Sequence, residues 1–198
     1  MIQSPQPRVV MIGDSSVGKT ALVYRMCQGE WMEPAPTVTT SFFSYHASDG
    51  QEIQFWDTAG TERYRAVNSV YYHNATGAIL VFDLTNRQSF NSLSSWVDEF
   101  MSLAQPGAIL AVAGNKCDLS NQFQVKPEEG EQWAKSQNFD YFTTSAQSGH
   151  HVAELAEYMA QNLPNRVFLK PSPKTVKLTD NQNKSENADK SNKNDFCC

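Results

Sequence analysis

An eight-residue stretch, Gly13 to Thr20 with the sequence GDSSVGKT, constrains this chain more than any other feature. It matches the pattern GxxxxGK[ST] at every fixed position. The apolar run Val9–Ile12 before it is typical of a buried strand, and Ala21–Cys27 after it has helical spacing. Where a strand, a glycine-rich turn and a helix start meet, backbone N–H groups and the positive helix end converge on phosphate oxygens. The stretch therefore predicts a nucleotide phosphate site.

Four residues of the motif have separate tasks in such a site. Gly13 permits the tight turn, and Gly18 lets the backbone approach a phosphate without a Cβ clash. Lys19 can reach the β- and γ-phosphates, and the Thr20 hydroxyl can bind Mg²⁺. The alternative is a chance match in a helix-capping loop, and the strand and helix patterns on either side disfavour it.

Length and charge limit the classes of function. A chain of 198 residues suits one domain with a tail, and its net charge is −5. Residues 1–165 hold 9 Lys and Arg against 17 Asp and Glu, whereas residues 166–198 hold 7 against 4. The first part lacks the net basic charge that nucleic-acid binding favours, so we expect no nucleic-acid partner. The positive tail could favour an anionic membrane.

Strand and helix patterns alternate along the chain. After the first strand and helix, strands are expected at residues 41–47, 51–56, 77–82, 109–113 and 140–144. Helices are expected at residues 89–104, 127–137 and 150–163. The second and third strands form an antiparallel hairpin at Asp49-Gly50. This order predicts an α/β fold with a mostly parallel sheet and helices on both faces, which binds ligands at the carboxyl ends of its strands.

The termini and cysteines indicate the cellular setting. Residues 166–198 are too poor in apolar side chains to repay the entropy of folding, so we expect a disordered tail after a folded domain at residues 1–165. Cys27 and Cys117 show neither metal-ligand spacing nor a disulfide framework, which fits a reducing cytosol. No signal peptide and no membrane-spanning run is indicated.

Two further loops carry chemistry. Asp57 ends a strand and suits the Mg²⁺ shell, and Gly60 follows with an N–H that can face a γ-phosphate. Asn115-Lys116-Cys117-Asp118 follows another strand. An ionised carboxylate only accepts hydrogen bonds, and guanine offers it a ring N–H beside an amine, whereas adenine offers no such pair. The second loop therefore predicts guanine selectivity, although each motif alone could be a turn or a cap.

These motifs together resemble the Ras-superfamily small GTPases, and among them the Rab family. The resemblance covers about residues 8–165 and rests on GDSSVGKT, WDTAGTERY (56–64), YYHNA (71–75), LVFDLT (80–85), NKCD, TSAQ (144–147) and the terminal Cys197-Cys198. It implies the small G-protein form of the P-loop NTPase fold, with six strands surrounded by five helices. It also implies a GTPase that uses Mg²⁺ and alternates between GTP and GDP.

The resemblance assigns roles to particular residues. The implied nucleotide-binding residues are Ser15, Ser16, Val17, Gly18, Lys19, Thr20, Thr37, Gly60, Asn115, Lys116, Asp118, Ser145, Ala146 and Gln147. The implied Mg²⁺ ligands are Thr20, Thr37 and Asp57, and catalysis would involve Lys19, Gly60 and position 61. Effectors would contact Phe42, Trp56 and Tyr71, for which the alternative is ordinary core packing.

The sequence departs from the family at four places. Thr61 stands where the glutamine that orients the attacking water is expected, so we expect slow intrinsic hydrolysis without an activating protein. The first switch loop is about one residue short between Trp31 and Thr37, which leaves Thr39 and Thr40 as competitors for the role of Thr37. Val38-Thr39 replaces a hydrophobic-glycine pair, and Gln147 replaces a common lysine with a small expected effect.

The resemblance also implies partners and a location. Cys197-Cys198 is similar to the double-cysteine ending that carries two geranylgeranyl chains, and two chains anchor stably where one does not. The expected partners are an exchange factor, a GTPase-activating protein, effectors, an escort protein and a dissociation inhibitor. We expect a monomer on the cytoplasmic face of an endomembrane, with a soluble cytosolic pool.

Three functions are compatible with these residues. The first is a GTP/GDP switch in vesicle traffic. The second is a GTP-dependent effector-binding platform that hardly hydrolyses GTP, which Thr61 favours. The third is a small nucleotide or metabolite kinase, which would need an arginine-rich lid, and the NKCD motif argues against it.

Overall fold

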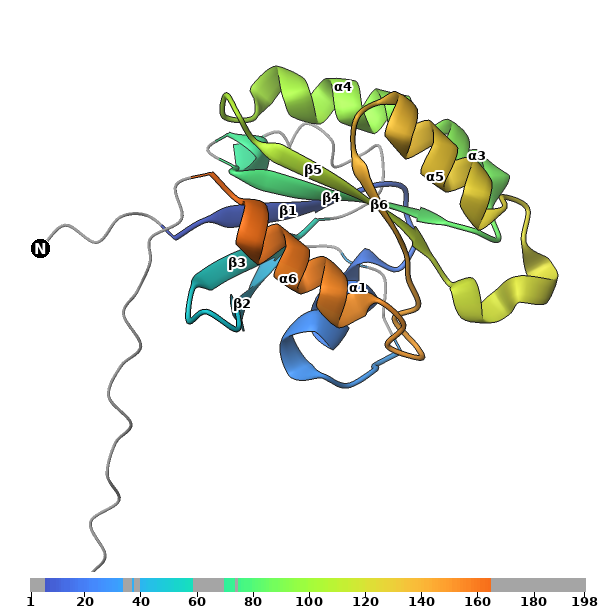
Figure 1. The fold of residues 1–198 in the computed structure, drawn as a ribbon, viewed down its shortest axis with the longest axis horizontal. Helices are drawn as coiled ribbons and strands as arrows, with labels where there is room; N and C mark the ends of the chain where they lie inside the picture. The colour runs from blue at the N-terminus through green and yellow to red at the C-terminus, as the bar shows by residue number, and fades with distance from the viewer. Residues whose placement is uncertain (1–5, 34–36, 38–39, 59–69, 74, 165–198) are drawn as a thin grey trace, which may run out of the picture.

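A computed structural model describes residues 6–33, 37, 40–58, 70–73 and 75–164 of the chain. Its centre is a six-stranded sheet in the order β2-β3-β1-β4-β5-β6 (Figure 1). Only the pair β2 and β3 is antiparallel. The strands are β1 (Arg8–Ile12), β2 (Ser41–His46), β3 (Glu52–Asp57), β4 (Gly77–Asp83), β5 (Ile109–Asn115) and β6 (Asp140–Thr143). The predicted α/β class and mostly parallel sheet are confirmed.

Helices cover both faces of the sheet. One face carries α1 (Lys19–Gln28) and α6 (Val152–Asn162), and the other carries α3 (Arg87–Asn91), α4 (Leu93–Leu103) and α5 (Pro127–Ser136) (Figure 1). Each face has its own core of buried apolar side chains. The central strand β4 is buried at every residue, as a parallel strand between two helical layers must be.

The hairpin of β2 and β3 forms as its turn residues predict. Gly50 adopts a positive φ of 86°, and the Gly50 N–H donates to the Ala47 carbonyl. Beyond the turn, Ser41 pairs with Asp57 and His46 pairs with Glu52. The register therefore leaves Asp57 at the end of β3, at the same sheet edge as the loop after β1.

The expected helix at residues 89–104 is divided by one turn residue, Ser92. The Ser92 hydroxyl and the Ser92 N–H both donate to the Gln88 carbonyl, so this side chain competes for a helical acceptor. Apolar spacing is insensitive to such a local break, because it continues across it. A 3₁₀ helix, η2 (Cys117–Gln122), also follows β5 and was not foreseen.

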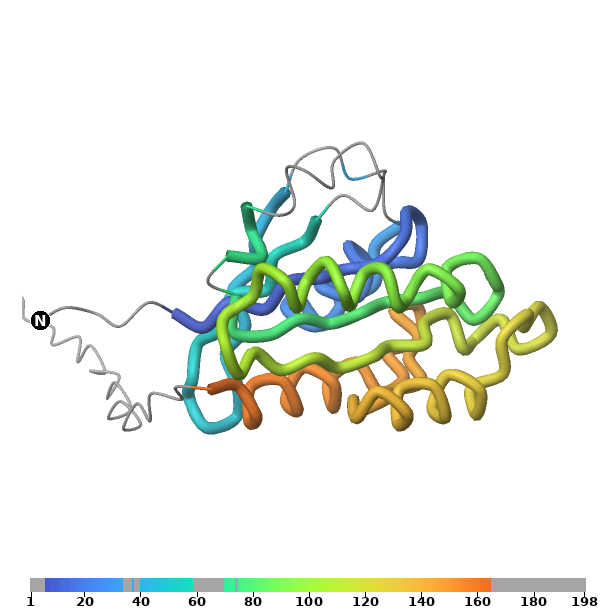
Figure 2. The backbone as a smooth tube through the Cα atoms, turned by 90° about the horizontal axis from the view of Figure 1, so that it is seen from above, coloured from blue at the N-terminus to red at the C-terminus, as the bar shows by residue number. Residues whose placement is uncertain are grey.

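The ends of the described chain lie away from the carboxyl ends of the parallel strands. Figure 2 shows the start of β1 and the end of α6 at one end of the molecule, and the loops after β1, β4 and β5 at the other. Within the described residues, no helix is both long and apolar enough to span a bilayer. The loops after β1, β4 and β5, which are distant in sequence, thus lie at the same edge of the sheet.

Candidate functional site: a phosphate loop and a base pocket

The loop between β1 and α1 has the backbone that its glycines predict. Gly13 has a φ of 136°, and a Cβ at this position would lie 2.1 Å from the Val81 carbonyl oxygen. Gly18 has a φ of 99°, and a Cβ there would lie 2.3 Å from the Asn115 side-chain nitrogen. Any larger residue at either position would push the loop off the sheet edge, so both glycines are needed for the loop to form.

Lys19 is the first residue of α1 and is only 5% exposed. Its ammonium donates to the carbonyls of Gly13 (2.8 Å) and Asp14 (2.6 Å). Burial lowers the pKa of Lys19 to about 8, against the attraction of the Asp57 and Asp14 carboxylates. A buried ammonium that is so poorly solvated is poised to gain from an incoming anion.

Asp57 lies next to two threonine hydroxyls. Its Oδ2 accepts from Thr20 Oγ1 at 2.7 Å and from Thr37 Oγ1 at 3.4 Å, and the two hydroxyls are 2.7 Å apart. Its Oδ1 is buried and has no hydrogen-bond partner among the described residues. Burial raises the pKa of Asp57, although Thr20, Lys19 and Thr37 act in the opposite direction. Two hydroxyls therefore bind one oxygen of a carboxylate whose other oxygen has no hydrogen-bond partner in the described part of the chain.

The loops after β5 and β6 are joined by side chains. Asn115 donates to the Val17 carbonyl at 2.9 Å and accepts from the Ala146 N–H at 3.2 Å. Ser145 Oγ donates to Asp118 Oδ1 at 2.5 Å, which leaves the other Asp118 oxygen for a ligand. The amide of Asn115 thus links the phosphate loop to the base loops.

Lys116 lines the cavity and contacts two other segments of the chain. It has a positive φ of 66°, its Nζ donates to the Ser16 carbonyl at 2.9 Å, and it forms an ion pair with Asp83 at 2.7 Å. Asp83 ends β4 directly opposite Asn115 in the register. Asp83 is a site residue that the sequence analysis did not identify, and its place at a strand end beside the NKCD strand was the available signal.

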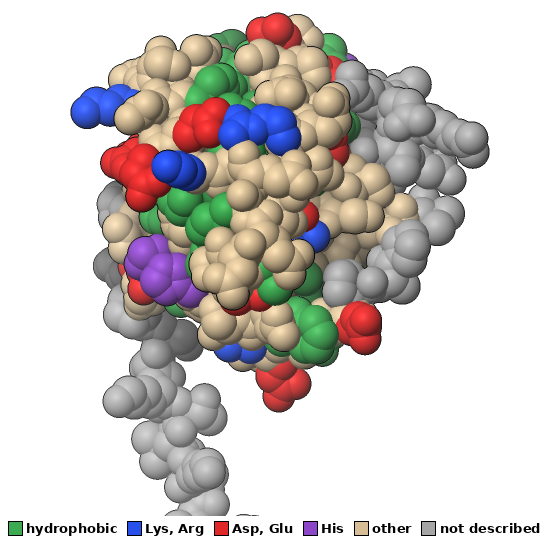
Figure 3. Space-filling view, turned by 90° about the vertical axis from the view of Figure 1, so that its right-hand side faces the viewer, with side chains coloured by type: hydrophobic (Ala, Val, Ile, Leu, Met, Phe, Trp, Pro, Cys, Tyr) green, Lys and Arg blue, Asp and Glu red, His purple; other side chains and the backbone are tan. Residues whose placement is uncertain are grey.

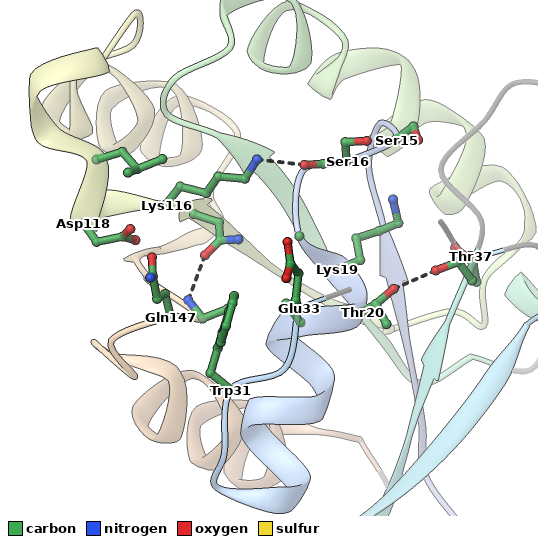
Figure 4. A pocket seen from close by; sticks show the side chains of 16 residues that line it. Ser15, Ser16, Lys19, Thr20, Trp31, Glu33, Thr37, Lys116, Asp118 and Gln147 are labelled. Carbon is green, nitrogen blue, oxygen red and sulfur yellow. Dashed lines mark hydrogen bonds between the residues drawn. The ribbon is translucent and has the colours of Figure 1, made fainter. Parts of the chain in front are cut away.

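These groups surround one cavity of about 410 Å³. In Figure 4 Trp31, Gln147 and Asp118 stand at one end, and Lys19, Thr20 and Thr37 stand at the other. These two groups of side chains therefore line one cavity from opposite ends. Its lining is Ser15, Ser16, Gly18, Lys19, Thr20, Ala21, Trp31, Glu33, Thr37, Thr58, Asn115, Lys116, Asp118, Leu119, Ala146 and Gln147.

Comparison with known proteins identifies the family. A model of the Ras family matches residues 8–165. The chain is a Rab-type small GTPase of the Ras family. Human Ras-related protein Rab-39A is 42% identical to it over 159 residues, which cover 75% of this chain and 73% of the relative. The rab-39 protein of Caenorhabditis elegans is 36% identical over 171 residues (82% and 75%), and mouse Rab-17 is 34% identical over 164 residues (81% and 77%).

Members of this family bind GTP or GDP with Mg²⁺. The residues of this Rab fit such an ion, because Mg²⁺ prefers oxygen ligands, the Thr20 and Thr37 hydroxyls contact the Asp57 carboxylate, and its buried Oδ1 has no partner among the described residues. The lining also fits a nucleotide, since it pairs an ammonium at one end with a free carboxylate oxygen at the other.

The three aromatic residues that the resemblance singled out form a row on this Rab. Phe42 stacks on Trp56 at 5.5 Å between ring centroids, and Trp56 contacts Tyr71 at 5.4 Å. Phe42 is 55% exposed, while Trp56 and Tyr71 are partly buried. The Arg8 guanidinium lies 4.3 Å from the Trp56 ring centroid and extends the row.

Several predicted positions lie outside the described residues, namely Gly60, Thr61, Val38, Thr39, Cys197 and Cys198. Thr40, one competitor for the role of Thr37, is described but does not line the cavity. Sequence reasoning missed Ala21, Glu33, Thr58 and Leu119 in the lining. Figure 3, which faces this end of the molecule, shows acidic and basic side chains interspersed over the described surface.

Proposed function

We propose that the cavity of this Rab GTPase holds GTP or GDP with Mg²⁺ through the residues described above. The observation that carries the proposal is the Asp57 carboxylate, which binds the Thr20 and Thr37 hydroxyls through Oδ2 and has an unsatisfied, buried Oδ1. The buried Lys19 directly precedes Thr20 in the sequence. Mg²⁺, when bound, neutralises phosphate charge. Thr20, Thr37 and Asp57 would hold it, and Lys19 would leave its two carbonyl acceptors for the β- and γ-phosphates.

The base end of the cavity supports guanine as the bound base. Asp118 keeps one carboxylate oxygen for the ring N–H and amine of guanine, while Ser145 fixes the other. Trp31 can stack on the base, and Ala146 and Gln147 line its edge. A base without the paired donors would leave the carboxylate unsatisfied at a cost of about 1–3 kcal/mol.

The proposed biological role is a switch in vesicle traffic. Thr37 lies in the first segment that a γ-phosphate would order, and Asp57 begins the second. The side chains of both approach the Thr20 hydroxyl. Ordering of these segments would present the row of Phe42, Trp56 and Tyr71 to effectors, and hydrolysis would release it. The expected regulators are an exchange factor and a GTPase-activating protein.

The tail supports a membrane location in this proposal. Two geranylgeranyl chains on Cys197 and Cys198, after a net positive tail, would anchor a monomer to the cytoplasmic face of an endomembrane. An escort protein would present the tail for modification, and a dissociation inhibitor would maintain a soluble pool.

Hydrolysis is proposed to be slow because of Thr61. A glutamine side chain can reach and orient an attacking water, whereas the short branched hydroxyl of threonine cannot span the same distance. An activating protein would supply the missing group. The same residue favours a second candidate function, a GTP-dependent effector-binding platform that stays in the GTP form.

Single-turnover GTP hydrolysis with Mg²⁺ tests this proposal. We expect the wild type to be slow and Thr61→Gln to be about ten-fold faster or more. The variant Thr175→Gln, the same exchange in the tail, controls for the substitution itself. Equal fast rates would contradict the role of position 61. Equal slow rates, with no response to an activating protein, would favour the binding platform.

A further inference from the structure

Trp96 links α4 to the phosphate loop through one hydrogen bond. Its side chain is 1% exposed, and its indole N–H donates to Asp14 Oδ1 at 2.7 Å. An indole nitrogen is a donor only, and a buried donor needs an acceptor. Because the acceptor is a carboxylate, the bond is stronger than one between neutral groups. The contact joins residues 82 positions apart.

Asp14 is placed differently from its neighbours in the loop. Ser15, Ser16 and Lys19 line the nucleotide cavity, whereas Asp14 does not. A free carboxylate at the second position of a phosphate-binding loop would repel phosphate oxygens. The bond to Trp96 holds this carboxylate toward α4 instead. At the same time the Asp14 carbonyl accepts from Lys19 Nζ at 2.6 Å, so the tethered residue also shapes the environment of the phosphate-binding ammonium.

Besides Lys19, three side chains of the described residues bind the loop, and two of them belong to the predicted guanine-binding motif. Lys116 holds the Ser16 carbonyl and Asn115 holds the Val17 carbonyl, each at 2.9 Å. Both of these contacts act on the second half of the loop. Trp96 contacts the first half of the loop, at Asp14. It does so from α4, which covers the sheet face opposite α1.

We propose that Trp96 is a positioning residue for phosphate binding: its N–H keeps the Asp14 carboxylate out of the cavity and the Asp14 carbonyl beside Lys19. The inference rests on the proposed function, since it takes the cavity to hold a guanine nucleotide. The effect should concern the β-phosphate, which Lys19 reaches, and not the base. Loss of the bond should therefore weaken GDP binding more than GMP binding.

The test compares GDP and GMP affinities of the full-length protein, measured by competition against a fluorescent GDP. Trp96→Phe removes the donor, and Asp14→Ala removes the acceptor and leaves the core side chain in place. We expect Trp96→Phe to lower the GDP affinity about ten-fold, as for one hydrogen bond to a charged group, and to change the GMP affinity less than about two-fold. Asp14→Ala removes the repelling carboxylate together with the acceptor, so it should lower the GDP affinity less than Trp96→Phe does. The double variant should match Asp14→Ala, because without the carboxylate Trp96 has no group to hold.

Two further variants separate positioning from stability. Asp14→Asn keeps an acceptor for Trp96, so its GDP affinity should not fall. Trp133→Phe makes the same exchange on α5, where Trp133 packs on Phe90, and should leave both affinities unchanged. If Trp96→Phe changes GDP and GMP binding by the same factor, changes neither, or costs no more GDP affinity than Asp14→Ala does, the proposal is wrong. If the wild type binds neither nucleotide, the proposed function itself has failed.

Discussion

Asp57 and Glu157 both accept hydrogen bonds from hydroxyl groups, but they differ in whether both carboxylate oxygens have a partner. Asp57 accepts from Thr20 and Thr37 on one oxygen only, and its buried Oδ1 has no partner among the described residues. Glu157 on α6 uses both oxygens: Oε1 accepts from the Tyr45 hydroxyl (2.8 Å) and the Ser48 N–H (2.9 Å), and Oε2 accepts from Ser48 Oγ (2.9 Å). One oxygen of Asp57 therefore lacks a hydrogen-bond partner among the described residues, whereas both oxygens of Glu157 have one.

The pKa shifts of the two groups follow this difference. Burial dominates at Asp57 and raises its pKa in spite of three favourable neighbours. Burial also acts to raise the pKa of Glu157, but the bonds from Tyr45 and Ser48 outweigh it and hold the pKa below its usual value. The raised pKa of Asp57 fits the ligand-binding role proposed for it, whereas the neighbours of Glu157 stabilise its charge and join α6 to the hairpin.

The largest effect should come from Asp57→Asn. The amide cannot supply a charged Mg²⁺ ligand, so we expect the affinity for GDP in the presence of Mg²⁺ to fall about 100-fold, which is about 2.7 kcal/mol. The free protein should keep its stability or gain some, because a poorly solvated charge is removed. The measurement is GDP affinity with Mg²⁺ and with a chelator, beside thermal unfolding without nucleotide.

Asp49→Asn in the hairpin turn is the matched control for this exchange, since asparagine suits the same turn. It should alter neither quantity. An Asp57→Asn protein that keeps a Mg²⁺-dependent gain in GDP affinity would remove Asp57 from the metal site and end the contrast with Glu157.

The sequence was sufficient for the parts of the site that lie at strand ends. A phosphate loop, an acidic strand end and NKCD each follow a hydrophobic run, and a parallel sheet brings such positions to one edge. The glycine pattern predicted a tight turn at Gly13 and a close backbone approach at Gly18, and in the structure both residues have a positive φ. The fold class was therefore predictable from the chain alone, and the same pattern led to the proposed base pocket.

Side-chain contacts that helices make with loops and with the hairpin could not be predicted in this way. Trp96 occupies an apolar helical position, and nothing in its spacing distinguishes a core tryptophan from one that donates to Asp14. The break at Ser92 depends on where one hydroxyl points, which is settled by tertiary packing. Likewise, Glu157 is one of many glutamates on polar helix faces until the hairpin is folded against α6.

A smaller effect on GDP affinity should appear when the pH is raised, because Lys19 in the proposed phosphate site can lose its proton. The free protein loses the Lys19 proton near its pKa of about 8, whereas bound phosphates would retain it. GDP affinity should thus fall by up to about ten-fold per pH unit above pH 8. GMP, which lacks the β-phosphate, serves as the control and also corrects for deprotonation of guanine. A GDP affinity that falls no more than the GMP affinity would show that Lys19 is already charged throughout.

The smallest effect should come from Glu157→Gln, and it should be purely structural. The amide offers one acceptor oxygen where three donors need two, so the free energy of unfolding should fall by about 1 kcal/mol at pH 7. Glu154→Gln, on the same helix and exposed, should change nothing measurable. Neither variant should alter GDP affinity, because Glu157 does not line the cavity.

The pH dependence of this loss gives the sharper test. The pKa of Glu157 in the folded protein lies below the ordinary value of 4.5, so the unfolded chain binds the proton more readily. The stability from the carboxylate is therefore complete above about pH 4.5 and disappears as the pH falls through the folded-state pKa. The difference between wild type and Glu157→Gln in urea unfolding should shrink over the same interval. A difference that is constant with pH would mean that the lost packing matters and the charge does not, and Glu157 would then no longer be the satisfied counterpart of Asp57.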